Sequence, residues 1–448
     1  MSADSESSGI GRRNLLRTTG LAALAGFGLS GCGSAFAAGM AGTGTSRETL
    51  TYWTLLGGGD GGRMVTMEEA YQKQNPDVKL QATTLAWGNP YYTKLSLATL
   101  GNQPPDVGIA HLTRASVLAQ ANLLEPLGLD ELARFGMGPD TFTPAAWKQA
   151  QTNGRVYAIP LDTHPFVMYY NTDVCSKAGL LNPDGTLKDI DGPDGLVNAL
   201  TAAKKVTGQY GGVLSINGDT ATCWRVFATL YYQLGGTVLG SDGTKVVLDH
   251  DKAEQVLSYL QKLTSTGLLP GSIDYGGTTT AFATNQAGFF FQGDWEVTTF
   301  ITAKTKFSMT RFPHVFTEGA YACQADSHSF VLPRDDKRDP ARRTMILKFI
   351  RGLLDQSDVW AAGGHIPAWL PFQDSAAYQK IKPQSNYADV ANSAHYDDPG
   401  WYSGSGSDFE NIMGSIIGAV LAGQLKPAQA ISQMVTKLTK YANTPSPV

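Results

Sequence analysis

The chain has 448 residues, which is long enough for two or three domains with well-buried cores. Its formal net charge of −4 gives no support for a basic nucleic-acid-binding surface. The 50 glycines and the low share of charged residues (17%) point to many loops, while 42% hydrophobic and 10% aromatic residues argue against disorder. The composition therefore predicts a folded protein and leaves both a binding protein and an enzyme open.

The N-terminal segment has the organisation of an export signal. A basic stretch with Arg12-Arg13 precedes an apolar run, Leu21 to Gly31, that is too short to span a membrane. The run ends in Leu29-Ser30-Gly31-Cys32, which resembles the lipobox of bacterial lipoproteins and implies cleavage before Cys32 and lipidation of its thiol. We interpret residues 1–31 as a twin-arginine signal peptide and residues 32–46 as a flexible tether. The alternatives are the general secretion route and an unlipidated signal that is cut a few residues later.

Strand-like and helix-like patterns alternate after this segment. The first half of the chain predicts strands at 49–54, 78–84, 107–110, 157–161 and 166–170, and helices at 64–74, 91–100 and 115–121. This alternation is typical of βαβ units and a mostly parallel sheet. The run Gly57 to Gly62 predicts a loop that approaches another group closely, and it lacks the spacing of a nucleotide-binding loop.

The second half of the chain continues the mixed pattern. It predicts strands at 245–248, 287–292 and 329–332, and helices at 196–205, 221–234, 253–265, 295–302, 341–354, 413–422 and 428–441. Asp294 is placed to cap the helix that follows it. The wide spacing of Cys175, Cys223 and Cys323 argues against a zinc site or redox pair, and we favour buried free thiols over a disulfide.

Several short motifs occur in order over residues 48–442. They are Leu50-Thr51-Tyr52-Trp53, Tyr92-Thr93-Lys94-Leu95, Pro105-Asp106-Val107, Asn122 to Leu127, Asn153 to Pro160 with Tyr169-Tyr170-Asn171, Gly293-Asp294-Trp295 and Gly364-His365-Ile366-Pro367. In this order they resemble the extracellular solute-binding proteins of ABC importers, in the branch that includes the maltose-binding protein. The resemblance implies an α/β periplasmic-binding-protein-like fold of type II, with two lobes and a hinge between them.

The resemblance also implies that each lobe is discontinuous in sequence. By analogy, the first lobe takes residues 47–162 and 306–356, and the second takes residues 163–305 and 357–448. The hinge crossings are then expected near Leu161–Thr163 and Lys304–Phe307. Without the resemblance, two independent domains in sequence would be the alternative.

Candidate ligand-binding residues follow from two physical arguments. Ligands of open α/β sheets bind beyond the carboxyl ends of the strands, where several polar residues of this chain are expected. A sugar offers an apolar face to aromatic rings and hydroxyls to charged or imidazole groups. The candidates are Asp60, Trp87, His111, Arg114, Asp162, His164, Asp219, Trp224, Trp295, His328 and Trp401. The alternative for each tryptophan is a place in the core, and Asp60 is also placed to cap a helix.

The resemblance implies a substrate-binding component of an ABC importer. Such a protein would capture a neutral di- or oligosaccharide by hinge closure and deliver it to the permease subunits, without catalysis, cofactor, metal or nucleic acid. We expect a monomer that is lipid-anchored on the outer face of the bacterial cytoplasmic membrane. The alternatives are a binding protein for a non-sugar solute, a secreted glycoside hydrolase, and a lipoprotein adhesin or sensor accessory on the same fold.

Overall fold

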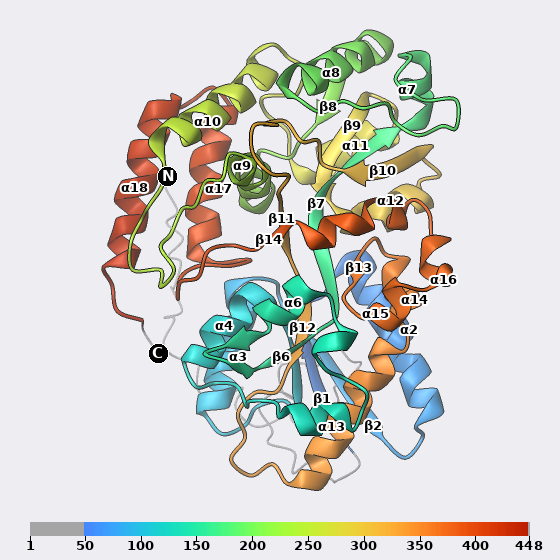
Figure 1. Ribbon diagram of the computed structural model, residues 1–448, viewed down its shortest axis with the longest axis vertical. Coiled ribbons are helices and arrows are strands. Elements are labelled where there is room, and N and C mark those ends of the chain that lie inside the picture. The colour runs from blue at the N-terminus through green and yellow to red at the C-terminus, as the bar shows by residue number, and fades with distance from the viewer. Residues whose placement is uncertain (1–48, 447–448) are drawn as a thin grey trace, which may run out of the picture. The chain divides into compact units, whose positions relative to one another are not determined.

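The computed structural model describes residues 49–446, which belong to one compact unit spanning Thr45–Val448. The predicted signal peptide, Cys32 and the tether lie outside the described residues. Two β-sheets, each covered by helices and each with its own hydrophobic core, define a first and a second lobe (Figure 1). Across residues 49–446, no helix has the length and apolar character needed to cross a membrane.

The first lobe is built on a five-stranded sheet in the order β2-β1-β3-β12-β6. Its strands are β1 (Thr49–Thr54), β2 (Lys79–Thr84), β3 (Val107–His111), β6 (Ala158–Pro160) and β12 (His328–Val331). β1 is parallel to β2 and β3, as the βαβ pattern predicts, whereas β12 runs antiparallel to both of its neighbours. The elements around this sheet are α2 (Gly58–Gln74), α3 (Asn89–Leu100), α4 (Leu112–Gln120), α5 (Leu129–Ala133), η1 (Pro139–Thr141), α6 (Pro144–Gln149), β4 (Gln151–Thr152), β5 (Arg155–Val156), α13 (Pro340–Leu354), α14 (Ser357–Ala361) and α15 (Leu370–Gln373).

The second lobe is built on a sheet in the order β14-β11-β7-β9-β8, with β10 and β13 also paired to β7. Its strands are β7 (Asp162–Asn171), β8 (Tyr210–Val213), β9 (Ala287–Gly293), β10 (Phe307–Arg311), β11 (Cys323–Asp326), β13 (Ile366–Pro367) and β14 (Ala394–His395). Every residue of β7 and β9 is buried, because helices or loops cover both faces of this sheet.

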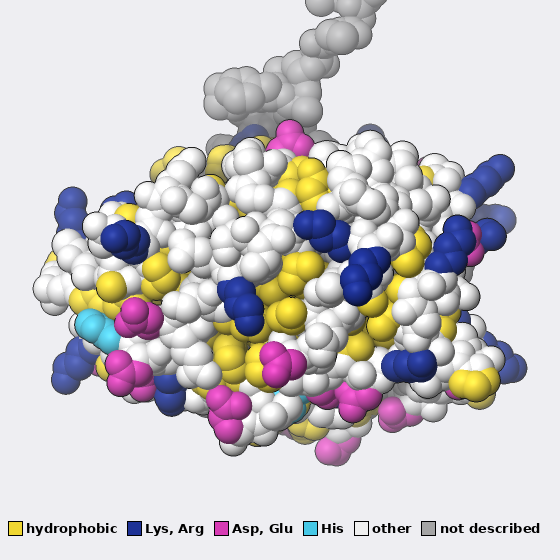
Figure 2. Space-filling view, turned by 90° about the horizontal axis from the view of Figure 1, so that it is seen from above, with side chains coloured by type: hydrophobic (Ala, Val, Ile, Leu, Met, Phe, Trp, Pro, Cys, Tyr) yellow, Lys and Arg dark blue, Asp and Glu magenta, His cyan; other side chains and the backbone are white. Residues whose placement is uncertain are grey.

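In the second lobe, α9 (Thr220–Gln233) is buried along most of its length, where it packs against two other helices and strand β11. The other helices of this lobe are α7 (Thr172–Lys177), α8 (Pro193–Thr207), α10 (His250–Ser265), α11 (Tyr275–Ala283), η2 (Asp294–Glu296), α12 (Val297–Thr302), η3 (Gln384–Asn392), α17 (Asp408–Leu421) and α18 (Pro427–Ala442). α16 (Ala376–Gln379) contacts α14 and α15 of the first lobe. The face at the top of Figure 1 carries Lys and Arg together with Asp and Glu, with no field of a single sign (Figure 2). This mixture agrees with the small net charge of the sequence.

The chain passes between the lobes at three places. It leaves the first sheet between β6 and β7, at the predicted crossing Leu161–Thr163, and β7 continues into the second lobe (Figure 1). It returns between β11 and β12, at Ser327, rather than near Lys304–Phe307. The predicted return is wrong because β10 pairs with β7 from Phe307 to Arg311, which keeps residues 306–326 in the second lobe.

The third crossing also differs from the expected boundary at residue 357. Trp360 and Trp369 are buried in the core of the first lobe, so α14 and the segment after it remain there. Between them, β13 pairs with the first two residues of β7, at the first crossing. Tyr387 and the fully buried hydrophobic residues after it belong to the core of the second lobe.

Two local predictions fail for identifiable reasons. Gly58 to Gly62 are the first turns of α2 instead of a loop, because Gly57 is extended and Gly61 N–H donates to its carbonyl at 3.0 Å. A Cβ at Gly61 would lie 2.8 Å from the Leu56 carbonyl, so a glycine is needed there. Residues 245–248 make one isolated bridge, Leu239 to Val246, and no strand, because they pair with residues 238–240 and not with either sheet.

The cysteine interpretation is confirmed within residues 49–446. Cys175, Cys223 and Cys323 are buried free thiols in the core of the second lobe. Burial raises the pKa of the Cys175 and Cys323 thiols to about 12, so both are protonated and unreactive at neutral pH.

Candidate functional site

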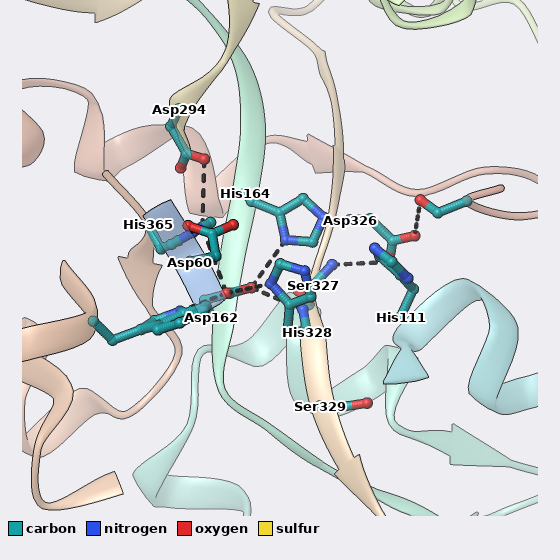
Figure 3. A network of polar contacts seen from close by, with 12 residues as sticks. Asp60, His111, Asp162, His164, Asp294, Asp326, Ser327, His328, Ser329 and His365 are labelled. Carbon is teal, nitrogen blue, oxygen red and sulfur yellow. Dashed lines mark hydrogen bonds and ion pairs between the residues drawn. The ribbon is translucent and has the colours of Figure 1, made fainter. Parts of the chain in front are cut away.

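The first two crossings and the segment around β13 bring a group of histidines and aspartates together at the junction of the lobes. Strand register explains the grouping: His328 on β12 lies opposite His111 on β3, and His164 on β7 lies opposite Asp326 on β11. Asp162 lies opposite Pro367, two residues after His365. Three of the seven histidines of the chain, His164, His328 and His365, thus surround one aspartate, and His111 lies beside them (Figure 3).

Asp162 is the centre of this group and is fully buried. Its Oδ1 accepts hydrogen bonds from the His328 backbone N–H (2.8 Å) and lies 3.0 Å from His164 Nδ1. Its Oδ2 lies 2.8 Å from His328 Nδ1 and accepts from Trp360 Nε1 at 2.7 Å. Burial alone would raise the pKa of Asp162, but the surrounding imidazoles lower it well below its usual range, so this residue is a buried carboxylate.

His365 lies between three carboxylates. Its Nε2 is 2.9 Å from Asp60 Oδ1, and its Nδ1 is 3.5 Å from Asp294 Oδ1 and 3.6 Å from Asp162 Oδ2. Its ring stacks on Trp360 with centroids 4.6 Å apart. Burial would lower the pKa of His365, but the carboxylates raise it to about 10 and thereby favour a cation at this position.

Two further histidines of the group, His164 and His111, have lowered pKa values. The His164 and His328 rings lie 4.3 Å apart, and His111 lies 5.0 Å from His328. Burial and the imidazole of His328 lower the pKa of His164 to about 3. The same causes lower the pKa of His111, whose Nδ1 lies 2.8 Å from the Tyr92 hydroxyl.

Two tryptophans approach this group from different lobes. Trp87, between β2 and α3 of the first lobe, is 45% exposed and lies edge-on to His111 at a centroid distance of 6.3 Å. Trp295, in η2 of the second lobe, lies edge-on to His164 at 6.0 Å. Each lobe therefore presents one indole ring to the same polar group, which is the arrangement expected for a sugar-binding cleft.

Arg225 makes the second lobe's side of the junction strongly polar. This residue of α9 is 3% exposed, its guanidinium lies 4.9 Å from the centre of the Trp295 ring, and its Nε and Nη1 have no hydrogen-bond partner among the described residues. Buried polar atoms without such a partner also include Asp219 Oδ2, Gln292 Nε2, both carboxylate oxygens of Asp294, Asp397 Oδ2 and Glu410 Oε2. A buried polar atom without a partner costs about 1–3 kcal/mol, so this set indicates a ligand-binding surface.

The acidic members of this set have perturbed pKa values. Burial raises the pKa of Glu410 to about 7 and that of Asp397 to about 6, although the charge of Arg225 opposes both shifts. Burial also raises the pKa of Asp294, which caps no helix, because Gly293 is the N-cap residue of η2. Perturbed carboxyl groups of this kind cluster at functional sites.

The structure brings most of the predicted residues to the junction and places others away from it. Asp60, Trp87, His111, Asp162, His164, Trp295 and His328 meet there, as described above. Arg114 lies close by, with its guanidinium 4.4 Å from the centre of the Tyr92 ring. Asp219 is the N-cap of α9 and accepts from Thr222 N–H at 3.0 Å.

Two of the predicted tryptophans pack elsewhere. Trp224 is fully buried against Phe409 at a centroid distance of 4.9 Å, and its Nε1 donates to Asp397 Oδ1 at 2.9 Å. It therefore supports a residue of the site and presents no face of its own. Trp401 packs on Tyr441 and donates to the Thr444 carbonyl at 3.0 Å, beside a surface cavity of its own.

The sequence analysis missed His365, Arg225, Asp397 and Glu410 as site residues. His365 lies within one of the quoted motifs, and a charged residue inside the apolar helix 221–234 was a signal for Arg225. Asp397 and Glu410 carry no local signal, because only the folding of the C-terminal segment onto α9 brings them near Arg225.

The fold and site together define a two-lobed α/β binding protein with a polar, tryptophan-flanked junction at its hinge. The sequence model of the bacterial extracellular solute-binding proteins matches residues 66–394, and the chain belongs to this family. Members of the family and the neighbours below are substrate-binding transport proteins that act outside the cytoplasm.

Curated relatives match about half of the chain. The arabinooligosaccharide-binding protein of Bacillus subtilis is 32% identical over 228 residues, which cover 49% of this chain and 48% of that protein. The sn-glycerol-3-phosphate-binding periplasmic protein of Escherichia coli is 23% identical over 246 residues, which cover 52% and 54%. The chain therefore spans about half the length of the curated relatives it matches.

Solved structures match most of the chain and support the two-lobed fold. A maltose-bound protein of T. maritima superposes with a TM-score of 0.72 at 17% identity, over 88% of this chain and 99% of the other. The GacH receptor of Streptomyces glaucescens, solved with and without acarbose, superposes with a TM-score of 0.71 at 17% identity, over 88% and 98%. The fold predicted from the sequence is thus confirmed.

Proposed function

We propose that this protein captures a neutral di- or oligosaccharide between its lobes and delivers it to the permease of an ABC importer. The observation that carries the proposal is the pair Trp87 and Trp295, one on each lobe, beside a shared group of buried polar side chains. The indoles would cover the apolar faces of sugar rings, and the polar groups would bind the hydroxyls. The half-length similarity to an arabinooligosaccharide-binding protein agrees with this ligand class.

The unpartnered polar atoms favour a neutral ligand over a phosphate ester. They include donors, on Arg225 and Gln292, and acceptors, on Asp219, Asp397 and Glu410. A hydroxyl both donates and accepts and can satisfy such a mixed set, whereas a phosphate needs donors. The carboxyl groups would repel a phosphate beside Arg225, so the similarity to a glycerol-phosphate-binding protein does not extend to the ligand we propose.

Contacts between the lobes support capture by hinge closure. The buried Asp326 accepts hydrogen bonds from Thr113 of the first lobe and from Ser405 of the second, the latter at 2.8 Å. Arg63 on α2 donates to Thr298 on α12 at 3.0 Å, on another side of the junction. A ligand that touches both lobes would favour this conformation over one with the lobes apart, because only here can both tryptophans reach it.

The remaining parts of the proposal concern the protein as a component of a transporter. The lipobox supports acylation at Cys32, which would anchor an exported monomer on the outer face of the membrane through the tether. The protein is proposed to lack catalytic activity, since the family consists of binding proteins. Prolonged incubation with oligosaccharides should therefore release no smaller sugars.

The proposal is tested by a thermal-shift screen over arabino-, malto- and other neutral oligosaccharides, followed by calorimetry and X-ray scattering. We expect at least one oligosaccharide to raise Tm, to bind one per chain and to decrease the radius of gyration. Stabilisation by glycerol phosphates alone would contradict the proposed ligand class. Saturable sugar binding with no change in the radius of gyration would contradict closure of the lobes.

A further inference from the structure

We propose that Asp162, His164, His328 and His365 form a structural zinc site at the hinge. The four residues are at most 5% exposed, and one potential ligand atom from each lies within 4.8 Å of those of the other three. The Nδ1 atoms of the three imidazoles lie 3.0, 2.8 and 3.6 Å from oxygens of Asp162 (Figure 3). No metal was expected from the sequence, in which no Cys/His cluster has metal-ligand spacing.

The chemistry of the donor set suits zinc. Zn²⁺ binds imidazole nitrogen and carboxylate oxygen, with four tetrahedral ligands in structural sites. Ligand atoms already within 4.8 Å of one another need small side-chain movements to reach a common ion. Four protein ligands fill the tetrahedron and leave no open position for water, so the site would be structural.

The surroundings of the group fit a bound cation independently of the four ligands. His365 Nδ1 is buried, has no hydrogen-bond partner within residues 49–446 and faces the group, while Nε2 of the same ring lies 2.9 Å from Asp60 Oδ1. A carboxylate behind a metal-binding imidazole is the usual outer-shell partner, because it fixes the tautomer and the ring orientation. Asp294 adds a buried carboxylate 3.5 Å from the same Nδ1, so the group lies in a strongly acidic environment.

Binding would change protonation in a defined way. Each imidazole must offer an Nδ1 lone pair and keep its proton on Nε2. For His164 and His328, whose Nδ1 atoms now lie against oxygens of Asp162, this places the ring proton on Nε2. His365 would donate its Nε2 proton to Asp60 and release its Nδ1 proton to solvent, while the Trp360 indole would continue to donate to Asp162.

The ligands of the proposed zinc site come from the region where the two lobes connect. Asp162 and His164 come from the first crossing and His328 from the second, while His365 directly precedes β13, which pairs with β7 at the first crossing. One ion would therefore join two of the segments that connect the lobes to the short strand that pairs with the first of them. It would stabilise the hinge without contacting the outer parts of either lobe.

The test uses the full chain, stripped with a chelator and titrated with ZnCl₂ in a calorimeter, with Co²⁺ as a spectroscopic probe. We expect one Zn²⁺ per chain, a rise in Tm and the intense visible absorption of tetrahedral Co²⁺. His365→Gln and His164→Gln should abolish the tetrahedral spectrum and weaken binding at least 100-fold, and Asp60→Asn should weaken it about 10- to 100-fold. His250→Ala, which removes an exposed histidine, is the matched control and should bind as the parent does.

Circular dichroism separates unfolding from the loss of a ligand, and Asp60→Asn keeps the test decisive if a ligand variant does not fold. Three results would overturn the proposal. They are zinc affinity that is unchanged in His365→Gln and His164→Gln, an octahedral Co²⁺ spectrum, and the absence of saturable zinc binding to the stripped chain. In the last case the group is a hydrogen-bonded hinge network centred on Asp162. Sugar binding is measured separately, so its failure would not affect this inference.

Discussion

The loop before α17 offers a direct test of whether ligand affinity depends on contact between the lobes. Gly406, in the second lobe, has φ +67° and lies against Gly88 of the first. A Cβ at Gly406 would lie 2.6 Å from Gly88 Cα, which is backbone and cannot rotate away, and 3.3 Å from the Trp87 indole. The change Gly406→Ala should therefore oppose contact between the lobes.

The expected effect has two separable parts. An alanine at positive φ costs about 1–2 kcal/mol whether or not the lobes touch, and this cost lowers the free energy of unfolding. The overlap between the added Cβ and Gly88 exists only when the two lobes touch, and an overpacked contact costs about 1–3 kcal/mol. Affinity for the oligosaccharide identified in the screen should therefore fall roughly 5- to 150-fold, at about 1.4 kcal/mol per factor of ten.

A matched control separates the two parts. Gly423, after α17, has φ +73°, and nothing lies within 4 Å of the Cβ that an alanine would add. Gly423→Ala should lower stability by a similar amount and leave affinity unchanged, as measured by urea unfolding and calorimetry. If Gly406→Ala binds as tightly as Gly423→Ala, ligand binding does not require this contact, and the closure argument is wrong.

Three further predictions concern the site and the stability of the first lobe. Trp295→Ala should weaken oligosaccharide binding, measured by calorimetry, by about 1–3 kcal/mol, by analogy with aromatic stacking on bases. Trp401→Ala should leave the affinity unchanged, and equal losses in the two variants would show that Trp295 contributes no more to binding than Trp401. Burial raises the pKa of Glu68 on α2 to about 7, above the value of about 4.3 in an unfolded chain, so the folded state binds the extra proton and loses stability as pH rises from about 4.5 to 7. Glu68→Gln should then raise the free energy of unfolding at pH 8 by about 1–3 kcal/mol but not at pH 4, and a gain independent of pH would refute this cause. Asp106 accepts hydrogen bonds from Thr51 N–H at 2.7 Å and from Arg342 Nε at 2.7 Å. Asp106→Ala should therefore lower the free energy of unfolding, measured in urea, by about 3–5 kcal/mol. A loss below about 1 kcal/mol would show that these bonds contribute little.

Local sequence patterns predicted much of the secondary structure. The strands at 49–54, 107–110 and 287–292 and the long helices of both lobes form as expected, because apolar spacing and turn residues act over short distances. β10 and β11 were not predicted, although Phe307 to Thr310 and Cys323 to Asp326 each alternate between apolar and polar residues, which is a strand signal that was not used. They form strands because β7 offers them an edge.

The sequence by itself determined the family, the two-lobed class of fold and most of the residues at the junction, because ordered motifs and strand-end positions are written along the chain. Only the tertiary structure decided how those residues meet. Asp162 and His365 are about 200 positions apart, and β13 pairs with β7 to bring them within 3.6 Å. Likewise, Trp295 became part of the site and Trp401 did not, because the pairing of strands and the packing of α18 fix which lobe face each indole meets. Contacts of this kind depend on long-range register, which no local pattern records.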